Sequence, residues 1–127
     1  MRENTLRLLG LMRRANALSV GEENTGSTAR AGKAALLLLA SDSSENARKR
    51  AQGFAGARQL PILTLPCTKA DFAAAVGVSG GSMAAVTDPG FAGALLRALA
   101  AEDTETYGEA AAAFPEQKKK RNSSKNR

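Results

Sequence analysis

Apolar residues near the start of the chain recur at the spacing of one helix face. Leu6, Leu9 and Met12 form a stripe with the arginines lying off it, which predicts a helix over residues 4–15. Further segments of helix-forming composition begin beside acidic or hydroxyl-bearing residues. They predict helices over residues 22–31, 45–57, 68–76 and 88–101.

Capping residues mark where several of these helices begin and end. The run Ser-Asp-Ser-Ser at residues 41–44 supplies an N-cap, and Gly32 is suited to end the helix that starts at residue 22. Thr68 followed three residues later by Asp71 is typical of a capping pair. Asp88 precedes a proline at the first helical position. We therefore interpret the acids Asp42, Glu45, Asp71 and Asp88 as helix-start residues rather than catalytic acids.

Short apolar runs alternate with these helices. The run Leu-Leu-Leu-Leu-Ala at residues 36–40 is typical of a strand buried on both faces. Residues 17–20, 61–65 and 83–87 supply three further strands. Alternating helices and strands with short connections predict an α/β fold, a three-layer α-β-α sandwich around a small mixed four-stranded sheet.

The pattern fades near residue 101, which divides the chain into two parts. We predict one folded domain over residues 1–101 and an acidic, then basic, mostly disordered tail over residues 102–127. A length of 127 residues fits a single domain. The net charge of +6 comprises +5 in residues 1–101, −4 in residues 102–114 and +5 in residues 115–127. A basic body and a basic tail favour a polyanionic partner, of which RNA is the commonest in a cytosol.

The composition argues against catalysis and metal binding. The chain has no histidine, and its single cysteine, Cys67, follows an apolar strand, where burial as a small hydrophobe is expected. A zinc site is not expected, and no P-loop pattern is present. The glycines at residues 77–81 precede a strand, whereas a dinucleotide fingerprint follows one. We predict a protein that is not an enzyme and that takes no cofactor, metal or small-molecule substrate.

Membrane insertion and secretion are not expected either. The longest strong apolar run, residues 34–40, has seven residues, and the N-terminus lacks the pattern of a signal peptide. We predict a cytoplasmic protein with no membrane partner.

Two segments are suited to contact a ligand. In residues 20–27 a glycine leads into a helix, so that free amides could meet a phosphate and carboxylates could accept hydrogen bonds from bases. Taken alone, this segment is more typical of a helix start with acids matched to the helix dipole than of a ligand site. The second segment, residues 77–82, is either a surface connection or a loop that presents Val78 to unstacked bases.

In the order of its motifs, the chain resembles the kink-turn RNA-binding ribosomal protein superfamily, which is the ribosomal protein L-seven-Ae group. The resemblance is particularly to the small bacterial members of this group. The resemblance covers roughly residues 6 to 100, and the order in which the matching stretches occur carries it. They are Leu-Leu-Gly-Leu-Met-Arg-Arg-Ala at residues 8–15, Ser-Val-Gly-Glu-Glu at 19–23, Ala-Gly-Lys-Ala at 31–34, Leu-Ala-Ser-Asp-Ser-Ser-Glu-Asn at 39–46 and Ala-Val-Thr-Asp-Pro-Gly-Phe-Ala at 85–92.

The resemblance implies an α-β-α sandwich whose RNA site combines the strand-to-helix turn with the loop before the last strand. It implies base contacts by Gly21, Glu22, Glu23 and Asn24, and contacts with flipped bases by Val78, Ser79 and Gly80. Such a site would read splayed bases, since a regular A-form major groove is too narrow to read.

Members of this superfamily usually carry Asn-Glu-x-x-Lys in the turn, and this chain departs from that pattern. One register places Glu23, Asn24 and Ser27 on the motif, and the other places Asn24, Thr25 and Thr28 on it. Neither register supplies the lysine. Arg30, Lys33 or the basic tail could compensate through phosphate contacts.

We therefore predict a monomeric, non-catalytic RNA-binding protein of ribosomal type that recognises structured, kink-turn-like RNA. The alternative is a protein-interaction module on the same fold that has lost specific RNA recognition. The missing lysine together with the acids Glu22 and Glu23 is the feature that favours it.

Overall fold

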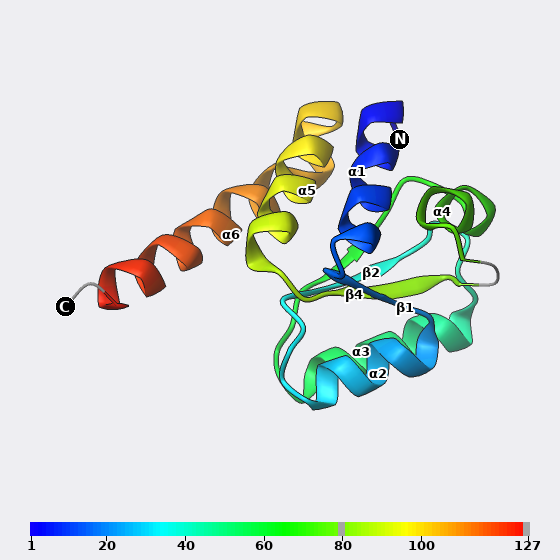
Figure 1. The fold of residues 1–127 in the computed structure, drawn as a ribbon, viewed down its shortest axis with the longest axis horizontal. Helices are drawn as coiled ribbons and strands as arrows, with labels where there is room; N and C mark the ends of the chain where they lie inside the picture. The colour runs from blue at the N-terminus through cyan, green and yellow to red at the C-terminus, as the bar shows by residue number, and fades with distance from the viewer. Residues whose placement is uncertain (79–80, 126–127) are drawn as a thin grey trace.

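A computed structural model describes residues 1–78 and 81–125, with side chains through Phe114. Its helices and strands alternate as the sequence predicts, with ends within a few residues of those expected (Figure 1). The elements are α1 (Glu3–Arg14), β1 (Leu18–Val20), α2 (Glu22–Arg30), β2 (Leu36–Leu39), α3 (Glu45–Gly56), β3 (Ile62–Thr64), α4 (Lys69–Val76), β4 (Met83–Val86), α5 (Pro89–Glu102) and α6 (Thr104–Lys125).

The four strands form one mixed sheet in the order β1-β4-β2-β3. The last strand in the chain, β4, lies antiparallel between β1 and β2, with Val20 opposite Ala84 and Leu39 opposite Met83. The edge strand β3 pairs with β2 in parallel. The predicted small mixed sheet is confirmed, and β1, β2 and β3 all run in the same direction.

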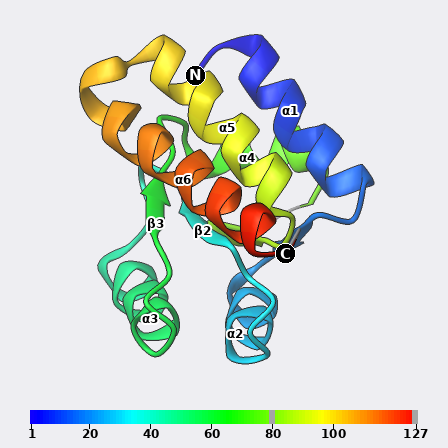
Figure 2. The same cartoon turned by 90° about the vertical axis from the view of Figure 1, so that its left-hand side faces the viewer.

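Helices cover both faces of the sheet, which confirms the three-layer sandwich. Helices α2 and α3 lie side by side on one face, and α1, α4, α5 and α6 lie on the other (Figures 1 and 2). All four residues of β2 and of β4 are buried as a result. Their continuous apolar sequence reflects this double coverage, because neither face of the two central strands meets water.

The predicted caps are present at three helix starts. The Oγ of Ser44 accepts a hydrogen bond from the amide of Ala47, and Thr68 Oγ1 accepts one from Asp71 N. Asp88 accepts from the first amides of α5. Asp42 is also a capping residue, but for α4 rather than for α3, since its Oδ1 accepts from the amide of Lys69 at 2.8 Å.

The structure corrects the predicted domain boundary. The sequence predicts a mostly disordered tail from residue 102, but residues 104–114 form the first turns of α6 and pack against α5. Tyr107 and Ala111 are buried there, and Tyr107 Oη donates a hydrogen bond of 2.6 Å to the carbonyl oxygen of Thr64. Asp103 starts the helix by accepting from Thr106 N and Oγ1. The folded unit therefore extends at least to residue 114.

The single cysteine is part of the core, as the sequence predicts. Cys67 is 6% exposed, and burial, with a smaller effect of the nearby Asp71 carboxylate, raises the pKa of its thiol from 9.0 to about 11. Burial likewise raises the pKa of Tyr107. A thiol with this pKa holds little thiolate at neutral pH, and the thiolate is the nucleophilic form.

Among the described residues, none of the helices combines the length and the apolar composition that a membrane span requires.

Truncating Tyr107 tests whether α6 belongs to the folded unit. We expect Tyr107→Ala to lower the free energy of unfolding by about 3 kcal/mol, because it leaves a cavity in the core. Tyr107→Phe removes only the hydrogen bond to Thr64 and is expected to cost about 1 kcal/mol. Urea unfolding measures both. The exposed variant Glu109→Gln serves as control, and equal stability of Tyr107→Ala and this control would exclude α6 from the unit.

The raised pKa of Cys67 predicts both slow labelling and a pH dependence of stability. Native protein at pH 8 is expected to react with iodoacetamide far more slowly than protein unfolded in guanidinium. Because the thiol ionises at lower pH when unfolded, its contribution to stability is complete below pH 9 and is lost as the pH rises from 9 to about 11. Comparison with Cys67→Ala isolates this loss from other alkaline effects. Complete, rapid labelling of the native protein at pH 8 would contradict the assignment.

Candidate nucleic-acid interface

The sheet topology brings the two segments singled out in the sequence to the same edge of the sheet. The strands β1, β2 and β3 all end there, and the antiparallel β4 begins there. We call this the strand-end edge, made of the turn at residues 21–24, the loop at residues 41–44, and Gly81 with Ser82. Helices α2 and α3 both start at the strand-end edge and run away from it.

The turn after β1 is in direct contact with the start of β4. The amide of Gly21 donates a hydrogen bond of 2.9 Å to the carbonyl oxygen of Met83. A Cβ on the buried Gly81 would lie 3.0 Å from Val20 Cγ1, so a glycine there allows close approach of the two segments. Their proximity is a property of the fold, whereas the RNA contacts implied for them stay a prediction.

Hydrogen bonds from the loop after β2 fix the other side of the edge. Ser82 accepts through its carbonyl oxygen from the amide of Ala40 at 2.9 Å and from Ser43 Oγ at 3.3 Å. Ser41 donates through its amide and its hydroxyl to the carbonyl oxygen of Cys67. The segment that enters β4 is therefore tied to two neighbouring strand ends, which holds the edge in one shape.

Gly21 has a backbone conformation that few other residues adopt. Its φ of 104° and ψ of 156° lie in a region restricted almost entirely to glycine. Gly21 is also the N-cap of α2, and no side chain caps the helix. Its carbonyl oxygen accepts from the amide of Thr25, which leaves the three preceding amides at the start of the helix without intrahelical partners. These amides are suited to bind an anion or a base acceptor.

The predicted side chains of the turn differ in their availability. Glu23 is exposed. Glu22 forms an ion pair with Arg50 of α3, and Asn24 Nδ2 donates to the carbonyl oxygen of Val20 at 2.9 Å. Glu23 is thus the carboxylate without an ion pair among the described residues of this turn, while Glu22 is balanced by a cation and Asn24 stabilises the turn.

Two arginines of α3 belong to this edge, and reasoning from the sequence did not assign them to it. Arg50 pairs with Glu22, and Arg48 Nη2 donates to the carbonyl oxygen of Ser41 at 3.2 Å. The run Arg-Lys-Arg at residues 48–50 was a visible signal in the sequence. Only the packing of α3 beside α2 shows that the run supplies cations to a turn that lacks the expected lysine.

The other predicted site residues do not all lie at the edge. Ser27 is exposed further along α2, and Arg30 and Lys33 are exposed at the opposite end of the helix. Val78 is half-buried against the main core, and its amide donates to the carbonyl oxygen of Ala73. Ser79 and Gly80 lie outside the described residues. The predicted set is therefore divided between the two ends of α2.

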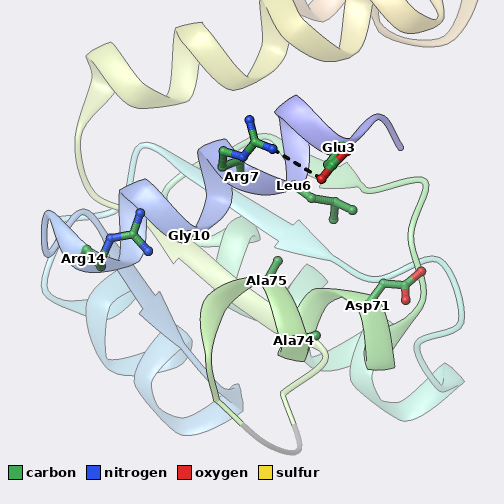
Figure 3. Close-up of a pocket in the computed structure, with 8 residues that line it drawn as sticks. All are labelled: Glu3, Leu6, Arg7, Gly10, Arg14, Asp71, Ala74 and Ala75. Carbon is green, nitrogen blue, oxygen red and sulfur yellow. Dashed lines mark hydrogen bonds and ion pairs between the residues drawn. The ribbon is translucent and has the colours of Figure 1, made fainter.

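A groove between α1 and α4 and the two groups with raised pKa values lie outside the strand-end edge. An open groove of about 340 Å³ lies between α1 and α4, and Gly10 is among the residues that line it (Figure 3). Its rim carries two carboxylates and two guanidiniums, Glu3 pairing with Arg7, so it does not extend the basic surface. Cys67 and Tyr107, whose pKa values are raised, belong to the main core. Among the described residues, no cluster of His, Cys, Asp and Glu could hold a metal ion.

Comparison with known proteins supports the fold. No protein-family model matches the chain, and no curated protein is significantly similar to it in sequence. A solved structure of a protein of unknown function from Bacillus halodurans has a TM-score of 0.67 and 29% identity. The match covers 74% of this chain and 94% of that one.

A second solved structure is that of the Giardia lamblia 15.5kD RNA-binding protein. Its TM-score is 0.54 at 18% identity, and the match covers 69% of this chain and 78% of that one. The chain thus has the α/β fold of a structure whose protein is an RNA-binding protein, in agreement with the fold that the sequence resemblance implies.

Proposed function

We propose that this protein binds structured RNA without catalysis, with the strand-end edge as its contact surface. The observation that carries the proposal is the contact of the turn at Gly21 with the start of β4, through the hydrogen bond from Gly21 N to the carbonyl oxygen of Met83 and the close approach of Gly81 to Val20. The turn and the start of β4 are distant in the sequence but lie side by side at the strand-end edge. The basic net charge of +6 and the fold shared with an RNA-binding protein support the same function.

The chemistry of the edge suits an RNA whose bases are splayed out of the helix. The amides at the start of α2 can donate to a phosphate or a base acceptor, and the exposed Glu23 carboxylate can accept from base amino and imino groups. Because the positive φ of Gly21 sets the direction of the chain into α2, it also sets the direction of these amides.

Arg48 and Arg50 supply the positive charge that the missing lysine would provide. Both arise from α3 and reach the turn or its neighbouring loop. The Arg50–Glu22 pair is partly exposed, with 61% and 43% of the two side chains accessible. Exposed pairs contribute little to stability, so Arg50 can exchange Glu22 for a phosphate at low cost.

The finer proposal is a kink-turn-like RNA, cytoplasmic location and association with the ribosome. The motif order in the sequence supports the kink-turn class, since it is that of the kink-turn-binding superfamily. The absence of histidine and the buried, protonated state of Cys67 support binding without a chemical step.

RNA selectivity across a salt series tests this function. Purified protein is titrated with a kink-turn RNA and with a matched duplex that lacks the kink. We expect tighter binding of the kink-turn RNA and a preference over the duplex that persists as the salt concentration rises, because base and shape contacts release few counterions. Equal affinity for the two RNAs with a steep salt dependence would mean that charge alone drives the binding. Absence of binding, with a protein partner captured after nuclease treatment, would favour the protein-interaction alternative.

Substituting Gly21 tests the role of the turn. Gly21→Ala forces an L side chain into a glycine conformation, and we expect a loss of about 1–3 kcal/mol in stability. The reoriented amides are expected to weaken kink-turn binding by about tenfold or more while duplex binding changes little. Gly56→Ala is the matched control, since a Cβ there has no atom within 4 Å and φ is ordinary. If the Gly21→Ala variant is folded and binds the kink-turn RNA with unchanged affinity, the turn does not recognise the RNA.

A further inference from the structure

A second basic site lies between the far ends of α2 and α3. A cavity of about 370 Å³ is present there, outside the strand-end edge. Its lining combines two arginines and one aromatic side chain with small residues. These are Ala29, Arg30, Gly53, Phe54, Ala57 and Arg58, and we call the cavity the α2–α3 groove.

Packing and a backbone hydrogen bond hold the two guanidiniums at the groove. The Arg30 guanidinium carbon lies 6.0 Å from the centre of the Phe54 ring, within cation–π range. Arg58 Nη2 donates a hydrogen bond of 3.0 Å to the carbonyl oxygen of Arg30. A Cβ at Gly32 would lie 2.8 Å from Arg58 Nη1, so Gly32 leaves space for this side chain.

Among the side chains that the structure describes, no carboxylate pairs with the guanidinium of Arg30 or of Arg58. Over residues 1–78 and 81–114, the ion pairs are Glu3–Arg7 and Glu22–Arg50. Lys33, exposed just beyond Gly32, adds a third positive charge at this end of α2. Two guanidinium groups beside one cavity supply the kind of charged donors that bind a phosphate group.

Gly53 is one of the small residues that line the groove. A Cβ at this position would have no atom within 4 Å, and its φ is ordinary, so a larger side chain can be introduced there without displacing a neighbour. Gly53 is therefore a position at which the groove can be filled without changing its charge.

We propose that the α2–α3 groove is a phosphate-binding site and that it takes a phosphate of the RNA strand held at the strand-end edge. The part of this proposal that assigns the phosphate to RNA rests on the function proposed above. Helix α2 has nine residues, so its ends are about 13 Å apart, a distance that one bound RNA spans. Arg30 and Lys33 then contribute to binding from this groove rather than from the turn.

RNA titration of the full chain is the first test. The double variant Arg30→Ala with Arg58→Ala is expected to weaken binding of kink-turn RNA by about tenfold. The salt slope is expected to fall by about 0.7–0.9 for each phosphate that the protein no longer neutralises. Selectivity for the kink over the duplex is expected to stay unchanged, since phosphate contacts carry no sequence information. Arg97→Ala, an exposed arginine of α5 on the opposite face, is the matched control.

Arg58→Lys and Gly53→Leu refine this test. Arg58→Lys keeps the charge but removes the fork, so it is expected to retain most of the salt slope and to bind RNA less tightly. Gly53→Leu fills the cavity without changing the charge and is expected to weaken RNA binding like the double variant. Thermal unfolding confirms that each variant is folded, because a folded variant with wild-type affinity counts against the groove.

Inorganic phosphate and adenosine monophosphate, titrated into ¹⁵N-labelled protein, separate this proposal from the proposed function. Shifts of the amides of residues 30–33 and 53–58 in the wild type but not in the double variant support a phosphate site even if RNA binding fails. If these shifts occur but the double variant binds RNA as tightly as the wild type, the site binds a free phosphorylated compound. That result would overturn the proposal that the bound phosphate belongs to RNA. Absence of both effects overturns the site.

Discussion

The position of β4 between β1 and β2 is the constraint on which the rest of the structure depends. This last strand pairs antiparallel with both neighbours and joins two strands that would otherwise have no common partner. Its centre consists of Ala84 and Ala85, both fully buried. Small side chains on both sides of the sheet let the helices on each face approach it closely, so a strand of four residues supports three layers. Burial on both faces also accounts for its continuous apolar sequence.

The same placement creates the candidate interface. Because β4 begins where β1 and β2 end, the segment before it lies between the turn at Gly21 and the loop after β2. The backbone is fixed there by strand hydrogen bonds, while the side chains and the start of α2 remain at the surface. Helix α3 contributes the nearby cations Arg48 and Arg50. At the other end of the two helices, the α2–α3 groove collects a separate group of cations around Phe54. Arginines thus lie near both ends of α2, and those near its start are accompanied by the acids Glu22 and Glu23.

Helix α6 shows how a tertiary contact can extend a domain beyond its sequence signal. Residues 102–114 are acidic and rich in alanine, without a wide apolar stripe. Two side chains, Tyr107 and Ala111, nevertheless become buried once α5 provides a surface. The hydrogen bond from Tyr107 to Thr64 then links the helix to the edge strand β3. A marginal helix in isolation gains its stability from such packing rather than from its intrinsic propensity.

Local patterns in the sequence determined the elements from α1 to α5, their order and most of their caps. The stripe in α1, the leucine run of β2, and the capping residues Ser44, Thr68 and Asp88 act within a few residues, so each was legible from the chain alone. The sequence also predicted that the turn at Gly21 and the loop before β4 are contact segments, and this stays a prediction. Only the tertiary structure decided that these two segments touch, that Arg50 reaches Glu22, that Arg30 belongs with Arg58, and that Tyr107 is buried. The physical reason is that helix periods and caps are set by neighbouring residues, whereas strand order and helix packing join residues that are far apart in the chain.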